Sequence, residues 1–128
     1  MMSIAAYSQQ YKDCLTNIGY VQNAAARLAA HVVVDGRVVA GCNVENASYG
    51  LGLCAECSLV SALTMQQAGK LVAFTCCDKN GDVLMPCGRC RQLLFEHSAP
   101  ELVLDTVSGF KTIAEVLPDA FGPNDLNI

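Results

Sequence analysis

The sequence predicts an α/β fold, in which a mixed sheet of about five strands is flanked by helices. Apolar residues recur at helical spacing in some segments and form short β-capable runs in others. These two kinds of segment alternate after an opening hairpin, which is typical of a sheet covered by helices. The chain has 128 residues, 52 % of them hydrophobic, enough to build the core of one domain. We therefore expect residues 1–128 to form a single domain.

A helix and a hairpin are expected in the first third of the chain. Residues 3–18 carry apolar side chains three and four positions apart, the spacing of one helical face. A strand leading to Val34 and a second strand over residues 37–42 flank Asp35-Gly36, a dipeptide that favours the two-residue turn of a hairpin. The run Ala24-Ala25-Ala26 has high helix propensity, so helix could replace the start of the first strand.

Two longer helices are expected in the rest of the chain. The first covers residues 53–68 and stops at Gly69, and the second follows Pro86, a residue favoured at helix starts, and covers residues 88–97. The smaller expected elements are a strand at 71–77, a turn at 79–82 that leads into 83–85, a strand at 102–104 and one or two helical turns at 113–117.

The charge balance limits the kinds of partner. Eight Lys and Arg against twelve Asp and Glu give a formal net charge of −4. A protein that follows a nucleic-acid backbone needs a basic stripe, so we expect no nucleic-acid partner and a small-molecule substrate instead. Only 16 % of the residues are charged. So apolar a composition predicts that other copies of the chain cover part of the surface, as in a homo-oligomer.

The sequence also carries a prediction of cellular location. No stretch is long and apolar enough to cross a membrane, and residues 1–11 lack the basic start and apolar run of a signal peptide. We therefore expect no membrane partner and a cytoplasmic location. Thiols stay reduced in the cytoplasm, so metal binding and burial explain the eight Cys residues better than disulfides do.

Three cysteines and a glutamate form the most informative pattern in the chain. Cys54-Ala55-Glu56 is followed about thirty residues later by Pro86-Cys87-Gly88-Arg89-Cys90. Three thiolates leave a fourth position on a Zn²⁺ ion for water, as in catalytic zinc sites, and Glu56 need not bind the metal. Cys-x-Glu followed by Pro-Cys-x-x-Cys is the pattern of zinc deaminases, in which the Glu is the general acid and base.

Two other interpretations of the cysteines remain open. Cys54-x-x-Cys57 and Cys87-x-x-Cys90 together resemble a structural zinc site with four cysteine ligands, and either pair alone resembles a thioredoxin-like redox motif. Against the structural site, the two pairs are further apart than in a zinc ribbon, the first opens a helix, and Glu56 would have no task. The redox interpretation leaves one of the two pairs unexplained.

Residues beside the expected ligands would offset the negative charge of three thiolates around one Zn²⁺. Helix N-termini each supply about half a positive charge, and the cysteines are expected in first helical turns. Arg89 and Arg91 could add hydrogen bonds to the sulfurs. Pro86 and Cys57 are also expected next to the metal ligands.

Longer stretches of the sequence resemble the homotetrameric, short-chain, zinc-dependent cytidine deaminases. The resemblance implies a three-layer α/β/α sandwich, a zinc cofactor and a homotetramer whose sites are completed by neighbouring subunits. The implied reaction is hydrolytic deamination of cytidine or 2′-deoxycytidine to uridine or 2′-deoxyuridine plus ammonia, a step of pyrimidine salvage. The matching motifs are Cys-Asn-Val-Glu-Asn-Ala-Ser-Tyr-Gly at 42–50, Cys-Ala-Glu-Cys at 54–57, Met-Pro-Cys-Gly-Arg-Cys-Arg-Gln at 85–92 and Leu-Pro-Asp-Ala-Phe-Gly at 117–122.

The resemblance also implies roles for individual residues. The three cysteines would bind zinc, and Glu56 would be the general acid and base. Taken alone, residues 43–46 would suit a solvated turn. A blasticidin-type aminonucleoside deaminase would keep the same metal and Glu and remains an alternative. The implied substrate contacts are Asn43 and Glu45 to the ribose hydroxyls, the Ala55 backbone N–H to the pyrimidine O2, and Tyr49 and Phe121 in a neighbouring subunit's site.

One segment departs from the family pattern. Relatives carry Pro-Tyr-Ser-x-Phe in the region of residues 22–31, and an ungapped alignment places Ala26 where that Phe packs beside the base. Loss of the ring removes contacts worth roughly 1–2 kcal/mol and opens space. The pocket would then be wider, binding plain cytidine less tightly or admitting cytidines substituted at the exocyclic nitrogen, unless another side chain fills the gap.

Overall fold

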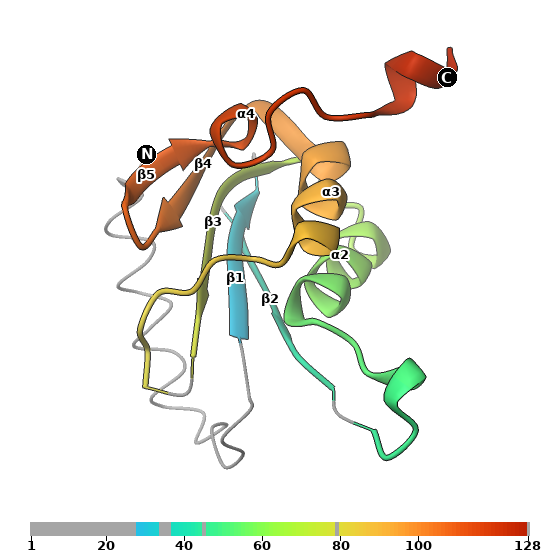
Figure 1. Ribbon diagram of the computed structural model, residues 1–128, viewed down its shortest axis with the longest axis vertical. Helices are drawn as coiled ribbons and strands as arrows, with labels where there is room; N and C mark the ends of the chain where they lie inside the picture. The colour runs from blue at the N-terminus through green and yellow to red at the C-terminus, as the bar shows by residue number, and fades with distance from the viewer. Residues whose placement is uncertain (1–27, 34–36, 45, 79, 128) are drawn as a thin grey trace.

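A five-stranded mixed sheet forms the centre of the structure (Figure 1). The computed structural model describes residues 28–33, 37–44, 46–78 and 80–127. The strands are β1 (Leu28–Val33), β2 (Val38–Cys42), β3 (Leu71–Cys77), β4 (Ser98–Thr106) and β5 (Gly109–Thr112). Their order across the sheet is β2-β1-β3-β4-β5. β3 and β4 are parallel, whereas the other neighbouring pairs are antiparallel.

Two helices, α2 (Ala55–Met65) and α3 (Gly88–His97), lie side by side on one face of this sheet (Figure 1). The shorter elements are α4 (Ile113–Val116) and the 3₁₀ helices η1 (Tyr49–Leu51) and η2 (Pro123–Leu126). The α/β fold with a mixed sheet of five strands, predicted from the sequence, is confirmed. The helix predicted for residues 3–18 lies outside the described residues.

Several elements lie where the sequence predicts them. β3 and α3 have the predicted bounds. β1 and β2 pair from Leu28 opposite Cys42 to Val32 opposite Val38, which confirms the two strands of the hairpin. The chain is strand from Leu28 onward, so helix does not replace β1; the Ala24–Ala26 run and the Asp35-Gly36 turn lie outside the described residues.

α2 is shorter than the helix predicted for residues 53–68. Leu53 and Val44 exchange two backbone hydrogen bonds of 2.9 Å, so the chain is still extended at this point. Cys54, with φ −69° and ψ 154°, precedes the first helical residue. At the other end Gln67 has a positive φ of 50°, which ends the helix before residue 68.

The sheet extends further at its β5 edge than the sequence predicts. β4 covers nine residues rather than only 102–104, and β5, which pairs antiparallel with it, is an element that the sequence did not predict. Residues 83–85 form no regular strand, since Val83 makes only an isolated bridge to Cys77. The predicted helical turns at 113–117 are α4.

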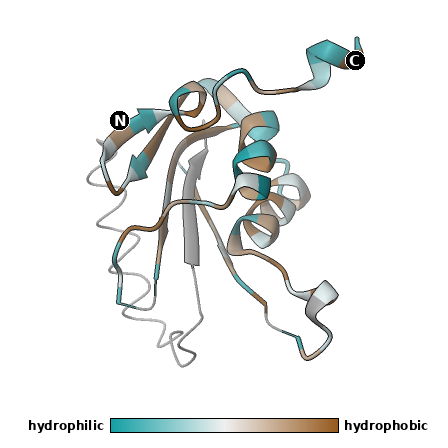
Figure 2. Cartoon of the chain, in the orientation of Figure 1, coloured by the Kyte–Doolittle hydropathy of each residue, from teal (hydrophilic) through white to brown (hydrophobic). Residues whose placement is uncertain are grey.

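The core lies between the sheet and the two long helices. Phe74 of β3, Leu59 of α2 and Leu94 of α3 are among its largest fully buried side chains. In Figure 2, β3 is coloured as hydrophobic along much of its length, whereas η2 is mainly hydrophilic. Burial of this apolar surface holds α2 and α3 in fixed positions relative to each other.

Gly41 allows β2 and the first turn of α2 to touch. A Cβ atom on Gly41 would lie 2.4 Å from both Leu59 N and Ser58 Oγ, and 2.5 Å from Ala55 O. Ordinary Cβ contacts begin at 3.4 Å, so only glycine fits here. The close approach places the end of β2 beside the start of α2.

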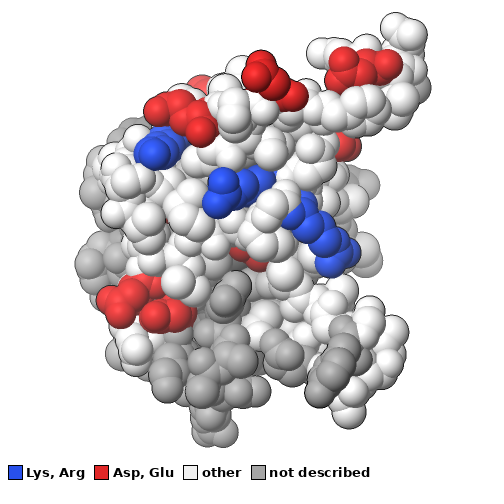
Figure 3. Space-filling model, viewed as in Figure 1, with Lys and Arg blue, Asp and Glu red and all other residues white. Residues whose placement is uncertain are grey.

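Charges of both signs are interspersed on the face shown in Figure 3, where basic side chains form a short row across the middle and acidic groups lie on both sides. Within the part of the chain that the structure describes, no helix combines the length and the apolar character needed to cross a membrane.

Candidate functional site

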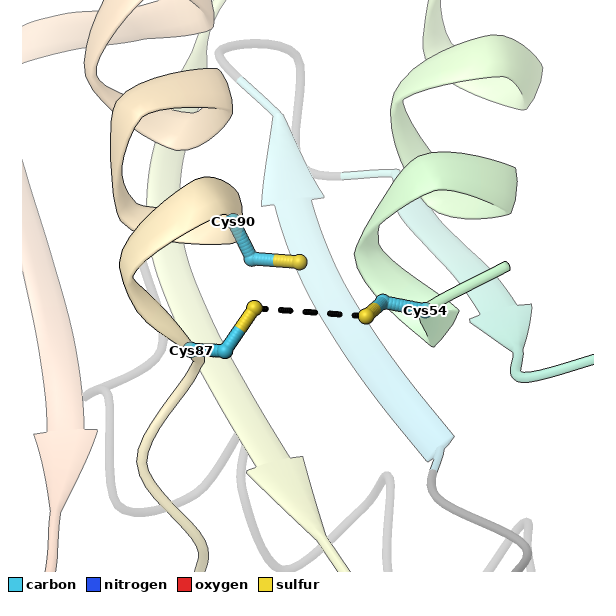
Figure 4. A group of neighbouring side chains, drawn as sticks. All are labelled: Cys54, Cys87 and Cys90. Carbon is cyan, nitrogen blue, oxygen red and sulfur yellow. Dashed lines mark hydrogen bonds between the residues drawn. The ribbon is translucent and has the colours of Figure 1, made fainter. Parts of the chain in front are cut away.

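Three cysteine sulfurs meet between the N-terminal ends of α2 and α3 (Figure 4). Cys54 directly precedes α2, Cys87 directly precedes α3, and Cys90 lies in the first turn of α3. Their Sγ atoms all lie within 4.8 Å of one another, and the Cys54–Cys87 separation is 4.0 Å. A tetrahedral zinc site with Zn–S bonds of about 2.3 Å needs sulfurs about 3.8 Å apart, so a slight contraction fits the ion. The predicted set of metal ligands is therefore brought together.

Local backbone geometry directs the sulfurs toward one point. Cys54 and Cys87 are both extended residues at the start of a helix, with φ −69° and ψ 154° and with φ −67° and ψ 169°, respectively. Each carbonyl accepts the first hydrogen bond of its helix, from Cys57 N at 3.0 Å and from Arg91 N at 2.9 Å. The positive ends of two helix dipoles thus converge on the cysteines, as the sequence predicted, and favour negative charge there.

The electrostatics of the three thiols differ. Burial raises the pKa of Cys90 far above the ordinary thiol value, and the Glu56 carboxylate raises it further. Burial also raises the pKa of Cys54. The pKa of Cys87 is lowered, mainly by the backbone N–H of Cys90, which stabilises its thiolate. Two thiols with raised pKa values beside a carboxylate can lose their protons together only when a cation neutralises them, and three soft donors suit Zn²⁺.

Glu56 is the acidic group of this site. It is the second residue of α2 and only 4 % exposed. Its carboxylate is close enough to Cys90 to raise the pKa of that thiol, so the acid lies beside the metal-ligand set. Because Glu56 lies in the first turn of α2 and Cys54 directly precedes that turn, the helix itself keeps the acid close to the Cys54 sulfur.

Cys57 is not part of the sulfur cluster. Among the described residues, the group able to hold a metal consists of the other three cysteines. The interpretation as a structural site with four cysteine ligands is therefore wrong: the thiol of Cys57 lies one position further along α2 than Glu56 and is carried out of the site by the helical turn. Cys57 instead lines a surface hollow of about 350 Å³, together with Val60, Arg89, Gln92, Leu93 and Glu96.

The arginines act differently from the sequence expectation. Arg91 donates from Nε to Pro86 O at 2.9 Å and from Nη1 to Val116 O at 3.0 Å. Its described bonds thus go to carbonyls rather than to sulfurs, and they hold the buried Pro86 immediately before Cys87. Arg89 is exposed and lines the hollow next to Cys57. The physical reason is the position of Arg91 on α3: its side chain extends toward α4 and the loop before α3.

The structure describes some of the predicted substrate-binding residues but not all of them. Asn43 is half-buried at the end of β2, and the Val44–Leu53 bridge holds its segment directly beside Cys54 and the buried Ala55. Tyr49 begins η1. Phe121 is 61 % exposed on the C-terminal segment and is not part of the hydrophobic core. Glu45 and Ala26 lie outside the described residues.

Ser58 is a site-building residue that the sequence reasoning missed. Its Oγ accepts a hydrogen bond from Cys42 N at 2.9 Å and has two acceptors in reach, Cys42 O at 3.0 Å and Ala55 O at 3.1 Å. One hydroxyl thus joins the end of β2, just before Asn43, to the first turn of α2. Gly41 could have indicated this contact in the sequence, because a glycine inside a strand often marks a place where another backbone segment approaches closely.

Comparison with known proteins identifies the family. The family model for the cytidine and deoxycytidylate deaminase zinc-binding region matches residues 6–106. The chain belongs to this family. The cytidine deaminase of Mycobacterium tuberculosis strain H37Rv is 57 % identical over 98 residues, which cover 77 % of this chain and 74 % of that protein.

Solved structures of cytidine deaminases have the same fold. The crystal structure of the enzyme from Mycobacterium leprae is 58 % identical, has a TM-score of 0.71, and is matched over 73 % of this chain and 79 % of its own. The enzyme from Bacillus anthracis is only 21 % identical but has a TM-score of 0.74 over 94 % of this chain and 93 % of its own, which supports the fold alone. Family membership and the geometry agree that zinc is the metal of the Cys54, Cys87 and Cys90 cluster.

Proposed function

We propose that this chain is a zinc-dependent cytidine deaminase, a hydrolase that converts cytidine or 2′-deoxycytidine to uridine or 2′-deoxyuridine and ammonia. The observation that carries the proposal is an open set of three converging thiols with the buried Glu56 carboxylate beside it. A fourth protein ligand would leave no room for water, and Cys57 does not join the set. Relatives that are more than half identical carry the name cytidine deaminase.

The cysteines and Glu56 divide the chemistry between them. Cys54, Cys87 and Cys90 would hold the ion, which supplies a Lewis acid that makes water acidic enough to lose a proton near neutral pH. Glu56 accepts that proton as the water oxygen bonds to C4 of the cytosine ring, and delivers it to N3. The same carboxylate then takes the proton of the new C4 hydroxyl and passes it to the departing amine. The C4–N bond breaks, and one water is consumed for each ammonia released.

The residues around Ala55 would orient the nucleoside. The Ala55 backbone N–H would bind the pyrimidine O2, and Asn43 and Glu45 would hold the ribose hydroxyls, since an amide donates and a carboxylate accepts from sugar O–H groups. The Val44–Leu53 bridge supports this arrangement, because it ties the ribose-binding segment to the residue before Cys54. An uncharged nucleoside suits a surface on which charges of both signs are interspersed (Figure 3).

The assembly is part of the proposal. Residues 1–128 would form one deaminase domain, and four copies would associate so that Tyr49 and Phe121 complete a neighbour's site. The exposed apolar side chains of Leu51, Phe121 and Leu126 support contact with other copies. A cytoplasmic role in pyrimidine salvage and a widened pocket near Ala26 stay predictions from the sequence.

A direct assay separates this proposal from its alternatives. The zinc-loaded protein is mixed with cytidine, 2′-deoxycytidine, an N4-alkylated cytidine and blasticidin S, and ammonia release is measured together with the zinc content per chain. We expect one zinc per chain and ammonia from cytidine. Turnover of blasticidin S alone would favour an aminonucleoside deaminase. Full zinc content without any ammonia would contradict an enzymatic function.

A further inference from the structure

Gln92 fastens the C-terminal segment to the helix that carries two of the cysteines. Its Nε2 donates to Phe121 O at 2.8 Å and to Glu96 Oε1 at 2.9 Å, so both amide hydrogens are in use. Gln92 follows Cys90 by two residues on α3. In Figure 1 the segment leaves α4, passes α3 and ends in η2 beyond the body of the protein.

Two further contacts fix the backbone on either side of Phe121. Gly122 is buried against the ring of Phe95, where a Cβ atom would lie 2.7 Å from Cε1, so the backbone rests directly on that ring. Upstream, Arg91 Nη1 donates to Val116 O at 3.0 Å. Neighbouring residues of α3 therefore hold one backbone carbonyl upstream of Phe121 and the carbonyl of Phe121 itself, and Gly122 rests on Phe95 of the same helix.

The side chain of Phe121 is not held by its own chain in the same way. Its backbone carbonyl is bound, whereas the residue as a whole is 61 % exposed, and Leu126 further along the segment is 55 % exposed. A rigid backbone that presents an exposed aromatic ring is suited to fill a pocket on another molecule, because the ring loses little conformational freedom when it docks.

We propose that Gln92 is a positioning residue that fixes the backbone of Phe121 so that its ring completes the substrate site of a second copy of this chain. The inference deepens the proposed function and rests on it, since it assumes that the completed site binds a cytosine nucleoside. α3 then serves two sites: its first turn supplies Cys90 to the site of its own chain, and its next turn presents Phe121 to the site of a neighbour.

Three variants test the positioning role within one chain. Gln92→Ala removes the bond to Phe121 O, and Gln92→Glu keeps the shape but replaces the donor by an acceptor. We expect both to lower kcat/KM for cytidine by about tenfold, mainly through KM, with zinc content unchanged. Glu96→Gln is the matched control, because it keeps an Oε1 acceptor for Gln92, and its kcat/KM should equal that of the wild type.

Mixed oligomers show whether the ring acts on a neighbour. Glu56→Gln chains lack the acid but keep the bond from Gln92 to Phe121 O, and Gln92→Ala chains keep the acid but lack that bond. When the two are co-expressed in equal amounts, half of the sites with an intact Glu56 receive an anchored Phe121, so activity per Gln92→Ala chain should rise roughly fivefold. Adding Gln92→Ala to Phe121→Ala should cost nothing further.

Other outcomes overturn the inference without touching the proposed deaminase activity. Activity of the mixture equal to the sum of the separate parents would show that Phe121 acts within its own chain. A protein that deaminates cytidine as a monomer, or Gln92 variants with wild-type kcat/KM, would also contradict it. A wild-type protein that releases no ammonia from cytidine would instead contradict the proposed function itself.

Discussion

The contact at Gly41 makes the most demanding prediction, which is the effect of Gly41→Ala. The added methyl group would lie 2.4 Å from Leu59 N and Ser58 Oγ and 2.5 Å from Ala55 O, against 3.4 Å for an ordinary contact. β2 and α2 must therefore separate by about 1 Å, the shift that brings these contacts back to the normal range. Overpacking of this kind costs about 1–3 kcal/mol of unfolding free energy.

The same shift should affect catalysis. β2 leads into Asn43, and α2 begins with Ala55 and Glu56, so the separation moves the proposed ribose-binding residue away from the base-binding and acid groups. A displacement of about 1 Å in a positioned site can cost about a hundredfold in rate. We expect kcat/KM for cytidine to fall by tenfold to a hundredfold with zinc still bound, and the melting temperature to fall by about 4 °C for each kcal/mol lost.

Two companion variants make the Gly41→Ala experiment interpretable. Gly88→Ala adds the same methyl group where no atom lies within 4 Å, so its melting temperature should match that of the wild type. Ser58→Ala should not rescue Gly41→Ala, because the other two clashing atoms belong to the backbone of α2. Gly41→Ala with a wild-type melting temperature and wild-type kcat/KM would refute the argument from close packing.

The remaining predictions concern the metal and a helix cap. Cys90→Ser should lose zinc in an elemental assay, whereas Cys57→Ser should keep both zinc and activity; loss of zinc from the second variant would restore the four-cysteine interpretation. Because the pKa values of Cys54 and Cys90 are raised, both sulfurs are protonated near neutral pH without metal, and zinc uptake must release at least these two protons. The zinc dissociation constant, measured by chelator competition, should therefore rise by about a hundredfold or more for each unit that the pH falls between 8 and 6, and a pH-independent constant would show that the two sulfurs are not protonated in the metal-free protein. Thr112→Ala should cost roughly 1 kcal/mol in thermal unfolding by removing the N-cap of α4. Hydrogen bonds from Thr112 lower the pKa of Glu115. The stabilisation that its carboxylate gives to the cap is therefore complete above the unfolded pKa and is lost as the pH falls through the lower folded pKa. At acid pH the unfolding free energies of the variant and the wild type should then differ less.

The parts of the fold that sequence reasoning predicted are those with strong local signals. Residues 71–77 are an apolar run interrupted only by Thr75, and residues 88–97 follow a helix-starting proline; both elements have the predicted bounds. The start of α2 was placed too early because the Val44–Leu53 bridge, a contact between separate segments, keeps the chain extended up to Cys54. β5 is short and exposed, and only its pairing with β4 makes it a strand.

In the candidate site too, the locally determined features were predictable and the long-range contacts were not. The cysteine cluster was predictable because its spacing places each sulfur at the start of a helix, where the local backbone directs it. The partners of Arg91 were not, since they lie 5 and 25 residues away along the chain, and neither was the bond from Gln92 to Phe121, 29 residues away. Long-range hydrogen bonds of single side chains leave no periodic signal in a sequence.

Turnover of the Glu56→Gln variant at full zinc occupancy tests the account most directly. The variant keeps the shape of the side chain and all three sulfurs, so it should bind one zinc per chain. Its kcat for cytidine should fall by at least about a hundredfold, because the amide cannot accept a proton from water or return one to the amine. A zinc-loaded Glu56→Gln protein that deaminates cytidine at the wild-type rate would contradict the assignment of Glu56 as the acid and base of this site.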